Sequence, residues 1–316
     1  FPRRRSSDLF TTGGRSSARG IVRFLLTQSE PAVSLYVTPV EIDPENPALP
    51  ISYPSYYAFY LAKLIGSFAT LGMAEDTWAL NEGAIDEDAF LRQSKLIQNE
   101  REAMFFSALD RTRRGVVACV FDTTDRVQHM FFRNHESKQS AHTNVIEDLY
   151  RDMDRVVGRT LSYADKDTAL FVLSDHGFCS FRRGVNLNAW LHQNGFLALK
   201  EGFSEGGDYF EGIDWSRTQA YTFGLAGIYL NLCGREAQGI VPPDQTTALK
   251  AELIQRLAGL AEPTGEVAIQ NIYDAQIIYK GPYTDASPDL IVGYAAVYRA
   301  SWSVAVGKVT ASVFEE

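Results

Sequence analysis

The sequence predicts an α/β fold, a doubly wound and mostly parallel sheet with helices on both faces. Two patterns predict it. Short, almost wholly apolar runs alternate along the chain with longer segments whose apolar residues recur at helical spacing. Such runs are typical of strands buried on both faces of a parallel sheet, and their alternation with helices favours helices on both sides of it. Because these sheets bind ligands beyond the carboxyl ends of their strands, chemistry is expected at the strand ends.

The beginning of the chain is expected to be a lead-in without regular structure. Residues 1–30 are basic and rich in Arg, Ser and Gly without a period, so a flexible lead-in or linker is expected there. The α/β domain is then expected to occupy 31–316. Its first strand is expected at 33–42, where the residues alternate, and the proline-containing segment 43–47 forces a turn.

A largely helical segment is expected next, at about 55–112. Apolar residues recur at helical spacing over 56–71 and again over 86–109. The remainder of the chain alternates between the two kinds of element. Strands are expected at 115–121, 168–174, 227–232 and 289–294, and helices at 145–161, 187–196 and 248–260.

The composition is that of a folded chain with an acidic body. The 316 residues carry a net charge of −9, and the arginines concentrated in residues 1–23 make the remainder more acidic still. An acidic body argues against a broad nucleic-acid-binding surface, so no nucleic acid duplex is expected as a partner. No apolar stretch approaches the roughly 18 residues of a membrane-spanning helix, so no membrane segment is expected.

The cysteines give the only indication of a compartment. Cys119, Cys179 and Cys233 are odd in number and widely spaced, which argues against a disulfide framework or a zinc knuckle. They favour a reducing, cytoplasmic compartment. The chain begins with Phe1 rather than Met, and a signal peptide would have preceded it, so the compartment is left open.

Two of the expected strands end directly before metal-binding side-chain types. The strand at 115–121 leads into Asp125 and His129, which are four residues apart. On a helix these two side chains share one face with Cβ atoms about 6 Å apart, so a carboxylate oxygen and an imidazole nitrogen can reach one cation. By itself, however, an Asp and a His at this spacing also arise by chance.

The strand at 168–174 leads into Asp175 and His176, which are adjacent. A regular strand would send them to opposite faces, so both can serve one site only if the backbone leaves the strand there. Gly177 supplies the freedom for that break. The alternative is a capped turn without a metal.

Carboxylate and imidazole together suit Zn²⁺ or Mn²⁺ better than Ca²⁺, which prefers oxygen ligands alone. Two such pairs suggest two ions, and two ions roughly 3.5 to 4 Å apart form the clamp used in phosphoryl transfer. Arg182 and Arg183 follow on the same loop and are candidates for holding a phosphate oxyanion, the alternative being an exposed, solvated pair.

At these residues the sequence resembles a known family. TTDRVQHMFF (123–132) and FVLSDHGF (171–178) resemble the type I phosphodiesterase/nucleotide pyrophosphatase family of the alkaline phosphatase superfamily, above all its predicted phosphohydrolase/phosphomutase members. The similarity runs from about Val33 onwards and includes AEDTWALNEG and SPDLIVGYAAVYRASW. It implies an alkaline-phosphatase-like core. It also implies that Asp125 and His129 bind a first metal ion and that Asp175 and His176 bind a second.

The resemblance also implies residues that this sequence does not supply. The family site needs an upstream aspartate, a Thr or Ser nucleophile and a downstream histidine, and none is identifiable here. Thr11 and Thr12 lie in a basic, Gly- and Ser-rich context that does not resemble a nucleophile turn. The chain is therefore expected to be an internal fragment, with its core incomplete at both ends.

The expected function is that of a phosphoric ester hydrolase with two divalent cations, Zn²⁺ or else Mn²⁺. A metal-activated hydroxyl would attack phosphorus and form a covalent intermediate that water releases. The substrate would be a small phosphorylated molecule, a nucleotide or a phosphodiester, and this chain alone is expected to be inactive. The alternatives are a phosphomutase of the same superfamily and a non-catalytic metal-binding fragment.

Overall fold

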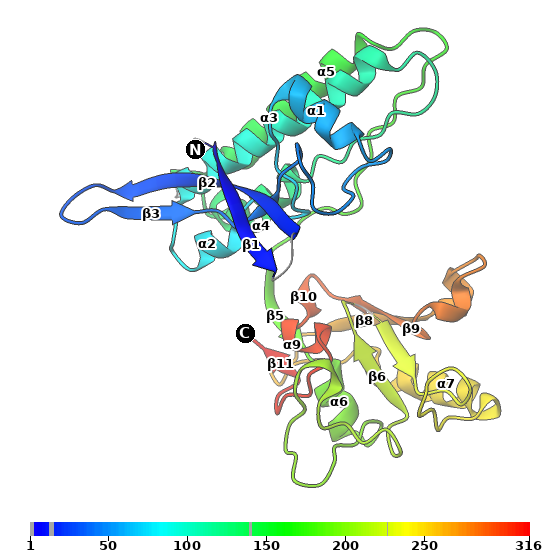
Figure 1. The fold of residues 1–316 in the computed structure, drawn as a ribbon. Coiled ribbons are helices and arrows are strands. Elements are labelled where there is room, and N and C mark those ends of the chain that lie inside the picture. Colours follow the sequence, from blue (N-terminus) through cyan, green and yellow to red (C-terminus); the bar gives the residue numbers. More distant parts are fainter. Residues whose placement is uncertain (1–2, 13–15, 139–140, 226) are drawn as a thin grey trace. The chain divides into compact units, whose positions relative to one another are not determined.

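A computed structural model describes residues 3–12, 16–138, 141–225 and 227–316. It contains helices and several sheets, so the predicted mixture of α and β elements is confirmed. The chain divides into two compact units, which we call the N-terminal unit (Phe1–Phe178) and the C-terminal unit (Cys179–Glu316). Figure 1 labels most of the elements of both.

The N-terminal unit begins with antiparallel strands. They are β1 (Arg3–Thr12), β2 (Ser16–Gln28), β3 (Ser34–Val37) and β4 (Glu41–Ile42), and β2 pairs with each of the other three. The structure thus has two strands where the sequence analysis expects a lead-in, although residues 1–2 and 13–15 of that segment lie outside the described residues. The physical reason lies in β2, where Ile21 and Val22 are buried and buried Arg23 pairs with Glu100 at 2.5 Å. As a domain boundary, residue 30 stays a prediction.

The helices of this unit follow the predicted spacing closely. They are α1 (Tyr57–Ile65), α2 (Thr77–Asn81), α3 (Glu87–Arg111), α4 (Thr123–Ser137) and α5 (Val145–Leu161). Asp86 caps α3 by accepting from the backbone N–H of Ala89 at 2.7 Å. Fully buried Phe90 and Phe131 stack at 6.1 Å between α3 and α4. The helices predicted at 86–109 and 145–161 are confirmed, whereas of 56–71 only Tyr57–Ile65 is helical, because the chain leaves the helix at Gly66, which has a φ of 87°.

In Figure 1 the long helices α3 and α5 lie side by side, joined by Lys95 and Asp152 at 2.5 Å and by Gln98 and Met153 at 3.5 Å.

Two predicted strands of this unit are not strands. Residues 115–121 and 168–174 have no regular structure, and most of their apolar side chains are exposed, 92% for Val116 and 87% for Leu173. A strand forms only when its backbone groups find hydrogen-bonding partners. No strand among the described residues pairs with either segment. The prediction of two central strands before the ligand motifs is therefore wrong for this structure.

The C-terminal unit holds two sheets. Its strands are β5 (Phe181–Val185), β6 (Ala220–Phe223), β7 (Gly227–Leu230), β8 (Ile269–Asp274), β9 (Leu290–Tyr294), β10 (Val297–Ala300) and β11 (Phe314–Glu315). The sheet β6-β7-β9-β8 is antiparallel throughout, whereas β5 pairs in parallel with β10 and antiparallel with β11. Described strands therefore pair mainly antiparallel, and the predicted mostly parallel sheet is not found. The short link between β6 and β7 is one reason, because it can only reverse the chain.

Helices cover the core of this unit. They are α6 (Leu187–Gln193), α7 (Thr246–Leu257), α8 (Ala275–Ile278) and α9 (Trp302–Ala305), with short 3₁₀ turns at Asp208–Phe210, Pro243–Gln245 and Thr284–Ala286. Leu230, Leu253, Ile269 and Leu290 are fully buried in one continuous cluster. The strands predicted at 227–232 and 289–294 and the helices predicted at 187–196 and 248–260 are confirmed by β7, β9, α6 and α7.

Candidate functional site

Helix α4 carries Asp125 and His129 on one face, as their spacing predicts. The His129 Nε2 atom lies 3.3 Å from the Asp125 Oδ1 atom. Asp125 is three-quarters buried and sits in the first turn of the helix, where a carboxylate is favoured by the helix dipole. The start of α4 is held by Thr124, whose hydroxyl donates to the Phe121 carbonyl oxygen at 3.0 Å.

The loop after 168–174 brings a second imidazole to the same carboxylate. The His176 Nε2 atom lies 3.6 Å from Asp125 Oδ1 and 3.6 Å from Asp175 Oδ2. Ser174 stabilises the loop by donating from its hydroxyl to the His176 carbonyl oxygen at 2.6 Å. The four predicted ligands therefore gather in one place within the N-terminal unit, with Asp175 at its exposed edge.

Phe178 forms an apolar support beneath the two imidazoles. Its ring meets that of His129 edge-on at 4.9 Å and that of His176 at 5.4 Å, and it also packs against Phe132 at 6.0 Å. The ring therefore restricts the orientation of both histidines. Sequence reasoning did not assign Phe178 a role, although the apolar residue directly after Asp-His-Gly was visible.

A buried carboxylate fixes the start of α4. The Thr123 hydroxyl donates to the Glu75 Oε1 atom at 2.6 Å, and Glu75 is only 1% exposed. The Glu75 Oε2 atom has no hydrogen-bond partner among the described residues. Glu75 was also missed from the sequence, although it belongs to the AEDTWALNEG stretch that carries the resemblance.

The type of these side chains fits a transition-metal site, but their arrangement is not that of a formed one. One carboxylate oxygen and two imidazole nitrogens converge, which suits Zn²⁺ or Mn²⁺. The second oxygen of Asp125 is paired with Arg126. In the described part of the chain no group of three or more His, Cys, Asp and Glu side chains has the geometry to hold an ion.

The other candidates lie elsewhere in the chain. Arg182 and Arg183 are on β5 in the C-terminal unit, where Arg182 pairs with Glu266 and Arg183 lies 3.5 Å from Glu262. Their charges are thus already paired in this structure. Thr11 and Thr12 belong to β1, whose side chains lie outside what the structure describes.

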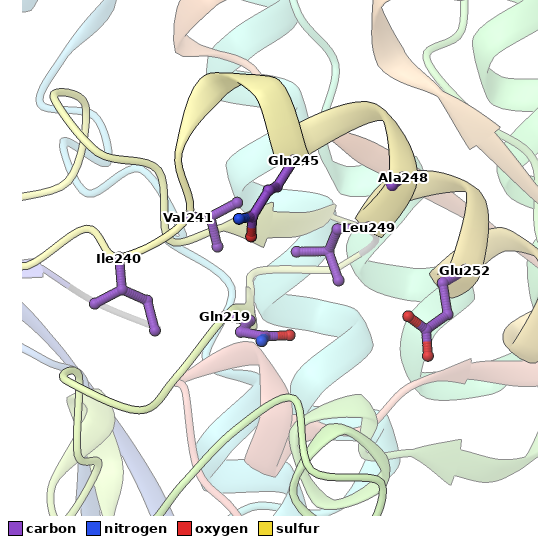
Figure 2. Close-up of a pocket in the computed structure, with 7 residues that line it drawn as sticks. All are labelled: Gln219, Ile240, Val241, Gln245, Ala248, Leu249 and Glu252. Atoms are coloured by element: carbon purple, nitrogen blue, oxygen red, sulfur yellow. The ribbon is translucent and has the colours of Figure 1, made fainter.

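Two cavities in the described part of the chain have none of the four predicted ligands in their lining. Figure 2 shows one of about 270 Å³ in the C-terminal unit, lined by Gln219, Ile240, Val241, Gln245, Ala248, Leu249 and Glu252. Another, of about 380 Å³ in the N-terminal unit, lies between α3 and residues 118–120. The candidate site is therefore a cluster at the surface of its unit and not one of these two cavities.

Comparison with known proteins decides the family. The family model described as type I phosphodiesterase/nucleotide pyrophosphatase matches residues 15–307. The chain belongs to this family. No curated protein and no solved structure matched it in the same comparisons.

Type I phosphodiesterases and nucleotide pyrophosphatases are hydrolases of the alkaline phosphatase superfamily that act on small phosphodiester or nucleotide substrates, generally with divalent metal ions. Membership supports an enzyme of this kind, and the mixed α/β structure is consistent with an alkaline-phosphatase-like fold. Among the described residues, no helix combines the length and the apolar composition that crossing a bilayer requires.

Proposed function

We propose that this chain carries the metal-binding part of a phosphoric ester hydrolase that acts on a nucleotide or a phosphodiester with two divalent cations. One observation carries the proposal. Asp125 Oδ1 lies 3.3 Å and 3.6 Å from the Nε2 atoms of His129 and His176, which come from a helix and a loop about 50 residues apart in sequence. Family membership supplies the reaction class.

In this proposal Asp125, His129, Asp175 and His176 hold the two ions, with Zn²⁺ as the first choice and Mn²⁺ as the second. When bound, such ions activate an attacking oxygen and offset the charge that develops on the phosphoryl group. The protein groups around the four ligands hold these side chains in place. Phe178 limits the rotation of both imidazoles, and the hydrogen bond from Thr123 to Glu75 fixes the helix that carries Asp125.

The proposal leaves the nucleophile outside the residues assigned here. The four ligands supply no hydroxyl, so we propose that turnover needs a Thr or Ser in addition and that this chain alone is inactive. Arg182 and Arg183 stay our candidates for a phosphate oxyanion, and each would have to leave its carboxylate partner to bind one. A doubly wound core also belongs to this proposal, and it would form only if residues 115–121 and 168–174, which are irregular in this structure, became strands.

One observation favours the non-catalytic alternative. Arg126 already pairs with Asp125, and a guanidinium there competes with a cation for the same carboxylate. A phosphomutase is the remaining alternative. It differs from a hydrolase in returning the phosphoryl group to a substrate hydroxyl instead of to water.

The test measures bound metal in the whole chain. After dialysis against Zn²⁺, we expect Asp125→Asn and His176→Ala each to weaken zinc binding by at least about 100-fold, since losing even an outer-shell partner costs 10- to 100-fold. His135→Ala is the matched control, because His135 lies on α4 but packs against Phe132 away from Asp125. Unchanged zinc binding in both ligand variants would end the metal assignment.

Activity is measured separately with bis(4-nitrophenyl) phosphate. We expect the chain loaded with zinc to show no turnover above that of the free ion. If the parent chain does cleave the ester and Asp125→Asn abolishes this cleavage, the hydrolase proposal stands. The proposal that this chain lacks the nucleophile would then be overturned.

A further inference from the structure

We propose that Arg299, Phe181 and Trp302 in the C-terminal unit form a binding site for an oxyanion attached to a flat ring, such as a nucleoside monophosphate. The site goes beyond the proposed function, because it needs neither a metal ion nor turnover. None of its residues was a candidate in the sequence.

The three side chains are brought together by neighbouring elements. Arg299 is on β10, and its guanidinium carbon lies 4.8 Å from the ring centre of Phe181 on β5 and 4.0 Å from that of Trp302. Since β10 and β5 are paired strands, residues far apart in sequence become neighbours here. Trp302 begins α9, which Ser301 caps by accepting from the Val304 N–H at 3.1 Å.

The guanidinium of Arg299 is held in a fixed orientation, but no carboxylate in the described structure neutralises its charge. Its Nε–H donates to the Ala300 carbonyl oxygen at 3.0 Å, and no carboxylate among the described residues pairs with it. Its terminal N–H groups, which form a planar fork that matches phosphate and carboxylate, therefore have no protein acceptor in the described structure. Burial lowers the pKa of Arg299, so an anion that neutralises the charge would be favoured there.

The other arginines of this unit show that an unpaired charge is unusual. Each of them lies beside a carboxylate: Arg182 (Glu266), Arg183 (Glu262), Arg217 (Asp214), Arg235 (Asp289) and Arg256 (Glu252).

Arg256 gives the closest comparison. It lies over two rings as well, 5.5 Å from Trp190 and 4.9 Å from Phe196, but its terminal nitrogens donate to Glu252 at 3.2 Å and to Asn194 at 2.6 Å. Stacking on aromatic rings therefore does not explain why the charge of Arg299 lacks a partner.

The rings beside Arg299 are open to a ligand. Trp302 is 69% exposed and Phe181 is 51% exposed, although both are large apolar side chains. A nucleobase stacked on an exposed aromatic ring gains between about fivefold and about 150-fold in affinity. A fork for the phosphate and a surface for the base thus lie side by side, which favours a nucleoside monophosphate over a small inorganic anion.

The test measures equilibrium binding of AMP to the whole chain by calorimetry. Bound metal is first removed with EDTA. We expect AMP to bind more tightly than either inorganic phosphate or adenosine, because each of these lacks one half of the ligand. Arg299→Ala should weaken AMP binding by about tenfold or more, since a hydrogen bond to a charged group contributes that much. Trp302→Ala should weaken it by at least about fivefold.

Arg256→Ala is the matched control, because it removes a stacked arginine whose charge is paired, and AMP binding should not change. Arg299→Lys keeps the charge without the planar fork and should also weaken binding, which guards against misfolding of the alanine variant. Equal AMP affinity in the parent chain and in both Arg299 variants would overturn the site. So would AMP binding that is lost in Asp125→Asn and retained in Arg299→Ala. The metal proposal is judged by zinc binding in Asp125→Asn and His176→Ala, and this one by metal-free AMP binding in the Arg299 and Trp302 variants, so the two can fail separately.

Discussion

The two units of the molecule bury their apolar residues in different ways. In the C-terminal unit one continuous cluster joins the sheet β6-β7-β9-β8 to α7, and side chains such as Ile228, Leu253 and Leu290 are fully buried. The N-terminal unit has two smaller clusters between its helices, and apolar residues of 115–121 and 168–174 stay exposed. Stability is not uniform within a protein and follows buried contacts. The C-terminal unit is therefore expected to resist unfolding more strongly than the N-terminal unit.

The largest effect is expected in the sheet of the C-terminal unit. Leu290→Ala should lower the free energy of unfolding by about 2–5 kcal/mol, because it leaves a cavity where a fully buried side chain packs. Urea unfolding of the whole chain measures it. Ile277→Ala is the control, since Ile277 is a large aliphatic residue of the same unit that is 72% exposed. Equal losses in the two variants would show that this cluster is not a packed core.

A smaller and pH-dependent effect is expected where α3 meets α5 in the N-terminal unit. Burial raises the pKa of Asp152, but hydrogen bonds from Lys95 and Arg155 outweigh it, so the pKa lies below its ordinary value of 3.8. A carboxyl with a lowered pKa stabilises the folded chain above its ordinary pKa, and the contribution is lost as pH falls through the lowered value. Asp152→Asn should therefore cost up to about 1 kcal/mol at pH 7, as for exposed ion pairs, and less below about pH 4.

Urea unfolding at pH 7 and at pH 3 separates this effect from others. Asp148→Asn is the control, because Asp148 pairs with Arg151 within α5 and so does not link two helices. A loss in Asp152→Asn that is the same at both pH values would show that the charge of Asp152 does not contribute.

The sequence predicted what depends on local spacing and missed what depends on pairing. Helices α3 and α5 and the shared face of Asp125 and His129 follow from a period that neighbouring residues impose on one another. Strand partners follow from contacts between distant segments, so neither the antiparallel sheets nor strands β1 and β2 were predicted. The contact of Arg299 with Phe181 was missed for the same reason, because it exists only when β10 pairs with β5.

The smallest effect is expected in the segment that precedes Asp175, and it tests the comparison most directly. Leu173 is 87% exposed, and among the described residues 170–173 donate no backbone hydrogen bond. Leu173→Ala should therefore change the free energy of unfolding by no more than about 0.5 kcal/mol, as exposed substitutions do. The amides of this segment should also exchange with deuterium far faster than those of β9. If Leu173→Ala instead costs about as much as Leu290→Ala and these amides are protected, the segment is a buried strand. The N-terminal unit would then contain the parallel strand that its apolar sequence predicts, and the difference between the two units would disappear at this segment.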